Sequence, residues 1–288
     1  MASIVSKRNP VLLIYKQSSL SVAGKLSGKL KNTKRFEDNH RVHYASLNKI
    51  EAVLRDFGVV YHKKTRNPNA DYSAFGLIIT VGGDGTVLDV ARNTSNSQLV
   101  LGVNSDPNWS IGQFCSATAL TFEEVLSHVL KGTHKISRLY KLKAVLNDGK
   151  TKKTMECLND ILICHSNPAA MSRYELTING RVEEQRSSGV WFSSAAGSTG
   201  AILSAGGKKL PISSLNIQYK PRELYHSRKN SAYHLTGGVI GPAQKAVIVS
   251  YMPRGSVFID GAHVRFPFTY SHKAEISHSS HYVQLVNA

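Results

Sequence analysis

Acidic side chains are scarce in this sequence: 19 Asp and Glu stand against 36 Lys and Arg, so the formal net charge at pH 7 is +17. A balance this basic favours anionic partners such as nucleotides, polyphosphate, nucleic acid or an acidic membrane. The sequence lacks the signatures of a helix-turn-helix, a zinc finger or an RNA-recognition motif. Nucleic acid is therefore not expected as a partner.

Cysteine and long apolar runs are also in short supply. The three cysteines, Cys115, Cys157 and Cys164, are odd in number and have no CxxC spacing. They predict neither a disulfide framework nor a zinc site, and they favour a reducing compartment. No apolar run approaches the roughly 20 residues needed to span a bilayer, so no membrane partner is expected.

The segment before Glu37 contains no acidic residue and is rich in Lys and Arg, a composition typical of a transit peptide. Residues 11–15, however, are apolar enough to form a first core strand, which leaves few residues upstream for cleavage. The expectation is therefore a cytoplasmic protein rather than one in the mitochondrial matrix. The basic stretch Lys16–Arg35 has no assigned role.

The most informative feature is the apolar run 77–81 followed by Gly-Gly-Asp-Gly-Thr over 82–86 and then by a helical pattern. Glycines before a helix N-terminus expose N–H groups that bind phosphate. A carboxylate within such a turn repels anions, which favours a chemical role for Asp84: orienting or deprotonating a hydroxyl that attacks a phosphoryl group. A tight turn without chemistry is the structural alternative.

The rest of the sequence predicts two kinds of architecture. Up to residue 133, expected strands at 11–15, 58–62, 77–81 and 99–104 alternate with expected helices near 43–57, 86–93 and 121–131. This alternation predicts a Rossmann-like open α/β domain over residues 1–133, with ligands at the carboxyl ends of its strands. Residues 134–288 show short β-type runs between turn signals and predict a mostly β domain.

Three further segments in the second half combine small or polar residues in patterns that suit a nucleotide. Asn159 and Asp160 are adjacent and offer donors and acceptors for ribose hydroxyls or an adenine edge. Gly197, Ser198 and Thr199 form a small-residue loop, and Asp260 precedes Gly261. Each segment taken singly is equally compatible with an ordinary turn, loop or hairpin.

In this order the four motifs resemble those of the NAD kinase family, and the resemblance covers nearly the whole chain. It implies transfer of the γ-phosphate of ATP, or in some members of a phosphate from polyphosphate, to the 2′-hydroxyl of the adenosine ribose of NAD. The sequence leaves open whether NADH is also an acceptor and whether polyphosphate can replace ATP. Mg²⁺ would arrive with the nucleotide rather than in a metal site built by the protein. The resemblance also implies a homodimer or homotetramer.

The resemblance assigns roles to particular residues. Asp84 would be the catalytic carboxylate, and Gly83, Gly85 and Thr86 would belong to the phosphate turn. Asn159 and Asp160 would hold the adenosine part of NAD. The remaining residues expected to bind substrate or nucleotide are Asn104, Asp106, Gly197, Ser198, Thr199 and Asp260.

Two segments depart from the common family pattern. Residues 195–201 read Ala-Ala-Gly-Ser-Thr-Gly-Ala where many members have Pro-Thr-Gly-Ser-Thr-Ala-Tyr, which changes the packing around a bound base. Residues 102–114 resemble the mitochondrial branch of the family and its bacterial relatives, and they make Asp106 and Trp109 candidates for substrate contact. Packing within the loop is the alternative for Trp109.

Two rival functions use the same turn. A diacylglycerol- or sphingosine-type lipid kinase would explain the basic charge through an anionic membrane, but the segments at 159–160 and 197–199 resemble NAD kinases instead. A non-catalytic module that senses NAD(P) would keep the pocket, and the presence of Asp84 argues against it.

Overall fold

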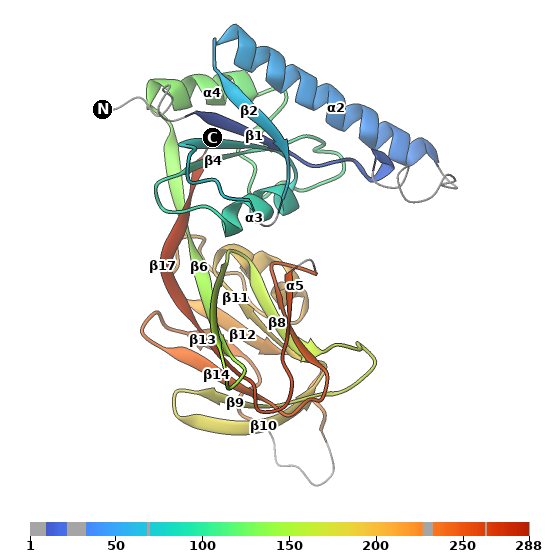
Figure 1. The fold of residues 1–288 in the computed structure, drawn as a ribbon, viewed down its shortest axis with the longest axis vertical. Coiled ribbons are helices and arrows are strands. Elements are labelled where there is room, and N and C mark those ends of the chain that lie inside the picture. Colours follow the sequence, from blue (N-terminus) through green and yellow to red (C-terminus); the bar gives the residue numbers. More distant parts are fainter. Residues whose placement is uncertain (1–9, 22–32, 68–69, 227–232, 263, 288) are drawn as a thin grey trace. The chain divides into compact units, whose positions relative to one another are not determined.

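The computed structural model describes residues 10–21, 33–67, 70–226, 233–262 and 264–287. It divides into two compact units (Figure 1): one holds the chain up to Arg138 and the segment from Val283 onward, and the other is Leu139–Tyr282. The chain passes between the units within two strands, β6 (Lys135–Asn147) and β17 (Lys273–Asn287). The segment from Val283 onward thus groups with the first unit, whereas the sequence analysis assigned it to the second.

The first unit is an open α/β fold around parallel strands in the order β4-β3-β1-β2. Gln284 and Leu285 of β17 add a parallel pairing to the outer side of β4. The strands are β1 (Val11–Tyr15), β2 (Tyr61–Thr65), β3 (Leu77–Gly82) and β4 (Leu99–Asn104), and the two-residue β5 (Ala117–Thr118) also pairs with β4.

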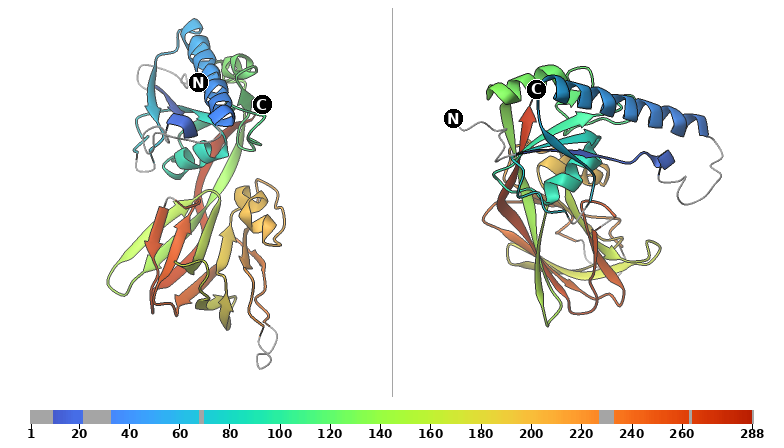
Figure 2. Two further views of the ribbon diagram at one scale, coloured as in Figure 1. Left: turned by 90° about the vertical axis from the view of Figure 1, so that its right-hand side faces the viewer. Right: turned by 45° about the horizontal axis from the view of Figure 1, so that its top comes forward.

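Helices cover both faces of this sheet (Figure 1, Figure 2). α2 (Thr33–Asp56) and α4 (Phe122–Lys131) pack on one face, where their apolar residues share a core with alternate residues of β1, β3 and β4. α3 (Asp84–Arg92) lies on the opposite face. Because both faces are covered, every residue of β3 and β4 is buried, and the strands read as continuous apolar runs.

The second unit is built almost entirely of antiparallel strands in two sheets. One sheet has the order β10-β9-β14-β17 and continues through β6 and β7; the other has the order β13-β12-β11-β8-β15-β16. Their apolar faces share one core. The strands not yet given are β7 (Lys152–Cys157), β8 (Asp160–His165), β9 (Ser172–Ile178), β10 (Arg181–Ser187), β11 (Val190–Ser193), β12 (Ile217–Pro221), β13 (Gly238–Ile240), β14 (Lys245–Ser250), β15 (Gly255–Ile259) and β16 (Val264–Pro267).

The predicted architecture, an open α/β domain followed by a β-rich domain, is confirmed. Two elements differ from the prediction in position. The second strand occupies Tyr61–Thr65 rather than 58–62. This edge strand is mostly exposed and polar, so no apolar run marks its position in the sequence. The first long helix begins at Thr33 rather than near 43, since its first turns have no regular apolar spacing. Much of the basic stretch Lys16–Arg35 lies outside the described residues. Among the helices that the structure describes, none is long and apolar enough to cross a membrane.

Candidate active site

The turn after β3 is shaped by glycines at points of close approach. A Cβ on Gly82 would lie 2.2 Å from Oγ1 of Thr86, and a Cβ on Gly83 would lie 2.9 Å from Oγ of Ser110. Gly85 is different, because a Cβ there would meet only Nη1 of Arg66, at 3.9 Å. Gly82 and Gly83 are therefore needed for the turn itself, whereas Gly85 leaves an open surface beside it.

Asp84 is the first residue of α3 and is half-buried. Its Oδ1 accepts a hydrogen bond of 2.8 Å from the backbone N–H of Phe114, which lies in the loop after β4. The neighbouring Cys115 thiol has a pKa raised to about 12, chiefly by burial and secondly by the charge of Asp84. The carboxylate is thus held in one orientation at the positive end of a helix dipole.

Cationic side chains follow two other strands at the same edge of the sheet. Lys16 comes directly after β1, where its N–H donates to the carbonyl of Val81 at 3.2 Å, and Arg66 directly after β2. Burial lowers the pKa of Lys16; the charge of Asp106 opposes this and that of Arg66 adds to it. Lys16 and Arg66 were not among the predicted site residues. Lys16 directly follows the expected strand 11–15, whereas Arg66 follows β2, which lies further along the chain than expected.

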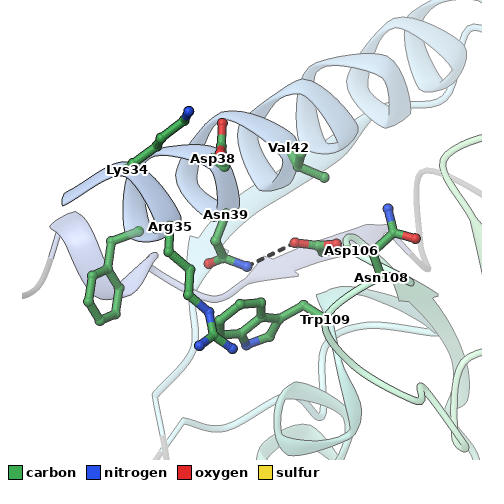
Figure 3. Close-up of a pocket in the computed structure, with 9 residues that line it drawn as sticks. Lys34, Arg35, Asp38, Asn39, Val42, Asp106, Asn108 and Trp109 are labelled. Atoms are coloured by element: carbon green, nitrogen blue, oxygen red, sulfur yellow. Dashed lines mark hydrogen bonds between the residues drawn. The ribbon is translucent and has the colours of Figure 1, made fainter. Parts of the chain in front are cut away.

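Asn104, at the end of β4, stabilises the loop that follows it. Its Nδ2 donates to the carbonyl of Ser110 at 2.9 Å, and its Oδ1 accepts from the Ser110 hydroxyl at 2.9 Å and from the Asp106 N–H at 3.2 Å. The structure therefore places Asn104 at the predicted edge but engages its amide within the loop. Asp106 instead accepts a 2.9 Å hydrogen bond from Nδ2 of Asn39 on α2 (Figure 3).

In the second unit, Asp260 holds the segment that contains Asn159 and Asp160. Oδ1 of Asp260 accepts from the N–H groups of Asn159 and Asp160 at 2.7 and 3.3 Å, and Oδ2 accepts from the N–H of Leu158 at 3.1 Å. Asp260 has φ = 47°, in the left-handed region that Asp tolerates better than most residues. Its observed contacts are thus with the backbone of the predicted binding segment.

Asp160 lies in an environment that favours its neutral form. Burial, and secondly the charge of Asp260, raise the pKa of Asp160 to about 7. Nδ2 of Asn159 donates to Oδ2 of Asp160 at 3.2 Å. A carboxyl group with this pKa is present in both protonation states near neutral pH, so it can donate a hydrogen bond to a ribose hydroxyl or accept one from it.

The small-residue loop packs against the same segment. A Cβ on Gly197 would lie 2.0 Å from the carbonyl oxygen of Asn159, so only glycine fits there. Ser198 is buried, and its Oγ donates to the Ala195 carbonyl at 2.7 Å and accepts from the Leu210 N–H at 2.9 Å. Thr199 is half-buried at the end of the 3-10 helix η1 (Ala196–Thr199). Asn159, Asp160, Gly197 and Asp260 are therefore brought together, while the Ser198 hydroxyl serves the loop.

The predicted site residues thus form two groups, each within one unit. Asp84, its turn, Asn104 and Asp106 belong to the first unit, and the residues around Asn159 belong to the second. Among the described residues, no group of three or more His, Cys, Asp or Glu side chains is arranged to hold a metal ion.

The sequence is similar to those of known NAD and NADH kinases. Residues 3–134 match the model of the ATP-NAD kinase N-terminal domain. A probable NADH kinase of Oryza sativa subsp. japonica is 36% identical over 267 residues, which cover 84% of this chain and 80% of the relative.

Two solved structures share the fold. The yeast NADH kinase complexed with NADH has a TM-score of 0.72 at 15% identity, covering 100% of this chain and 87% of that one. The NAD kinase from Archaeoglobus fulgidus in complex with ATP has a TM-score of 0.69 at 18% identity, covering 96% of this chain and 92% of that one. With the rice relative matched over most of both sequences, the chain belongs to the NAD kinase family.

Proposed function

We propose that this protein transfers the γ-phosphate of ATP to the 2′-hydroxyl of the adenosine ribose of NAD or NADH, forming NADP or NADPH. The observation that supports this best is the orientation of Asp84, whose carboxylate is held by the Phe114 N–H within a glycine turn at a helix N-terminus. The names of the relatives, NADH kinase and NAD kinase, support the same reaction.

On the donor side, the triphosphate is assigned to the turn Gly83–Gly85 and the cations beside it. The nine-residue helix α3 presents its positive end there. Burial and the charge of Arg66 lower the pKa of Lys16, so a phosphate beside Lys16 would stabilise its charged form. Arg66 itself pairs with Asp89 at 3.2 Å. Thr86 is buried, so its proposed part is to shape the turn rather than to contact the phosphate directly.

The chemical step assigned to Asp84 is the removal or steering of the proton of the attacking hydroxyl. Phe114 engages Oδ1, which leaves Oδ2 to accept this proton as the oxygen–phosphorus bond forms and the bond to ADP breaks. Because Phe114 holds the carboxylate in place, little reorganisation is needed when the acceptor hydroxyl arrives.

On the acceptor side, the adenosine half of NAD(H) is assigned to Asn159 and Asp160. Asp260 positions their backbone through three N–H groups, and Gly197 allows the loop 197–199 to approach them. Lys141 of β6 joins this group: it is 2% exposed, and the charges of Glu156 and Asp260 oppose the lowering of its pKa by burial. It supplies positive charge beside Asp260 and was not among the predicted site residues.

Mg²⁺ is proposed to enter with ATP and to neutralise charge on the transferring phosphate. In such sites the ion is held mainly by phosphates with one or two carboxylates. The carboxylate of Asp84 at this edge of the sheet fits that donor set. We also propose that polyphosphate can serve as a second donor. A homodimer or homotetramer and a cytoplasmic location are further proposals. The relatives found by comparison are NAD and NADH kinases and do not favour a lipid kinase.

The decisive experiment is product analysis by chromatography and mass spectrometry on wild type and Asp84→Asn, with Mg-ATP and either NAD or NADH. Wild type should form NADP(H), and Asp84→Asn should lower kcat by about 10² to 10⁴-fold, the usual contribution of a general base. The asparagine oxygen can still accept from the Phe114 N–H, so the fold should persist. Asp56→Asn, at an exposed position at the end of α2, is the control.

Two results would contradict the proposal. Near-normal turnover by Asp84→Asn would remove the assigned role of the carboxylate. No NADP(H) from wild type with ATP or polyphosphate, or phosphorylation of diacylglycerol in a parallel reaction, would overturn the function itself.

A further inference from the structure

A cavity of about 750 Å³ opens in the first unit between the start of α2 and the loop after β4 (Figure 3). Its lining includes Lys34, Arg35 and Asn39 from α2, and Asp106, Asn108 and Trp109 from the loop. None of the roles proposed above uses its aromatic wall. Its size suits a planar ring system rather than a single ion.

The aromatic wall is Trp109, whose side chain is 48% exposed. The guanidinium carbon of Arg35 lies 4.0 Å from the centroid of its ring, so a planar cation and a planar aromatic face lie together at the cavity. A tryptophan that served only to pack its loop would be largely buried. Indole and guanidinium planes are both surfaces on which nucleobases stack.

The polar wall is the hydrogen-bonded pair of Asn39 and Asp106, which are 9% and 6% exposed. Their bond uses Nδ2 of Asn39 and Oδ2 of Asp106. The same two side chains also present an amide oxygen and a second carboxylate oxygen, which accept hydrogen bonds from the amino and N–H groups of a base.

The cavity adjoins the proposed phosphate turn through Ser110, the neighbour of Trp109. The N–H of Ser110 donates to the carbonyl of Asp106 at 3.1 Å, and its hydroxyl lies where a Cβ on Gly83 would approach to 2.9 Å. Burial lowers the pKa of Lys16, the charge of Asp106 raises it, and the charge of Arg66 lowers it. A base at Trp109 would therefore have its phosphates directed toward the turn that contains Gly83 and Asp84.

We propose that this cavity holds the nucleobase of the nucleoside triphosphate donor, with Trp109 and Arg35 as the stacking surface and Asn39 and Asp106 as hydrogen-bonding partners. The inference rests on the proposed kinase function and specifies how that function selects its donor. It follows that a donor with a base is bound more tightly than one consisting of phosphates alone.

The kinetic test compares Trp109→Ala, Trp109→Phe and wild type. Trp109→Ala should raise KM for ATP about tenfold, the usual effect of losing one stacked base, while KM for NAD changes less than about twofold. Trp109→Phe keeps an aromatic face and should stay within about threefold of wild type. Ile111→Ala, at a 93% exposed position of the same loop, is the matched control. An unchanged KM for ATP, or a rise in KM for NAD instead, would overturn the assignment.

A binding test separates this inference from the kinase function. The sequence has two tryptophans, so Trp191→Phe leaves Trp109 as the sole tryptophan, whose emission is observed by exciting at a wavelength that tyrosine does not absorb. ATP and AMP should quench its fluorescence at concentrations where inorganic tripolyphosphate does not. Equal quenching by tripolyphosphate, or none by ATP, would overturn the base site. If wild type forms no NADP(H), the proposed function fails, and this titration still decides the site.

Discussion

His43 shows at the scale of one residue how the site edge is held together. It is fully buried on α2, and its Nε2 lies 2.8 Å from the carbonyl oxygen of Lys16, while Nδ1 lies 2.8 Å from Oγ of Ser105. A carbonyl only accepts, so Nε2 must bear the hydrogen, and in the neutral ring Nδ1 accepts from the serine hydroxyl. The histidine thus joins the ends of β1 and β4.

Burial lowers the pKa of His43 to about 4, and the charges of Lys16 and His40 add to this effect. Since the ordinary value is 6.5, the unfolded chain binds a proton between pH 6.5 and about 4 that the folded chain does not. The free energy of unfolding should therefore fall by on the order of 1 to 3 kcal/mol as the pH drops through this window.

Urea unfolding at pH 7 and pH 4.5 measures this dependence. His43→Gln, which does not titrate, should flatten it, and His128→Gln, on the exposed side of α4, should not. An identical pH dependence in wild type and His43→Gln would show that other groups are responsible.

At the scale of elements, the segment before β8 and the loop of η1 depend on each other. Asp260, directly after β15, holds the backbone of residues 158–160, and the carbonyl of Asn159 in turn accepts from the Ser194 N–H at 3.1 Å. Gly197 packs against that same carbonyl. Residues 158–160, the loop at 194–197 and Asp260 are distant in the sequence but are held together by these contacts. A methyl group added at Gly197 would disturb them.

Gly197→Ala should destabilise the protein by about 1 to 3 kcal/mol, because its Cβ would overlap the Asn159 backbone and force it to move. It should also raise KM for NAD(H) more than KM for ATP. Gly200→Ala is the graded comparison, since its Cβ would come no closer than 3.2 Å to a neighbour. Thermal unfolding and both KM values measure the effect; equal stability of the two variants would contradict the steric argument.

At the scale of the whole molecule, the net charge of +17 acts on every anionic substrate. Long-range attraction between a basic protein and a polyanion is screened by salt, with a screening length near 10 Å at 0.1 M. Mg-ATP bears more negative charge than NAD. The basic composition should therefore assist the donor more than the acceptor.

KM for ATP should rise by about threefold or more between roughly 50 and 300 mM salt, whereas KM for NAD should change less. Steady-state kinetics in potassium chloride at constant free Mg²⁺ measures both. A KM for ATP that does not respond to salt, or equal responses of the two constants, would show that the basic surface is merely solvated.

The sequence alone predicted the two architectures, the strand–turn–helix around Asp84 and the family, because these depend on local patterns. A buried parallel strand requires an apolar run, and a turn with crowded glycines tolerates no side chain, so both leave a signature in consecutive residues. The exposed strand β2 and the polar start of α2 leave no such signature, and their positions were misjudged.

Contacts between distant residues were decided only by the tertiary structure. The bond from Phe114 to Asp84 spans 30 residues, that from Asn39 to Asp106 spans 67, and those to Asp260 span about 100. No local pattern encodes them, since they arise when the sheets bring strand ends together. A side chain's partners depend on which strand ends lie side by side, and this is decided by the tertiary structure. Only there does Asn104 turn out to stabilise its own loop, and Asp260 to hold a backbone segment. The positions of Lys16 and Arg66 beside the turn were decided in the same way.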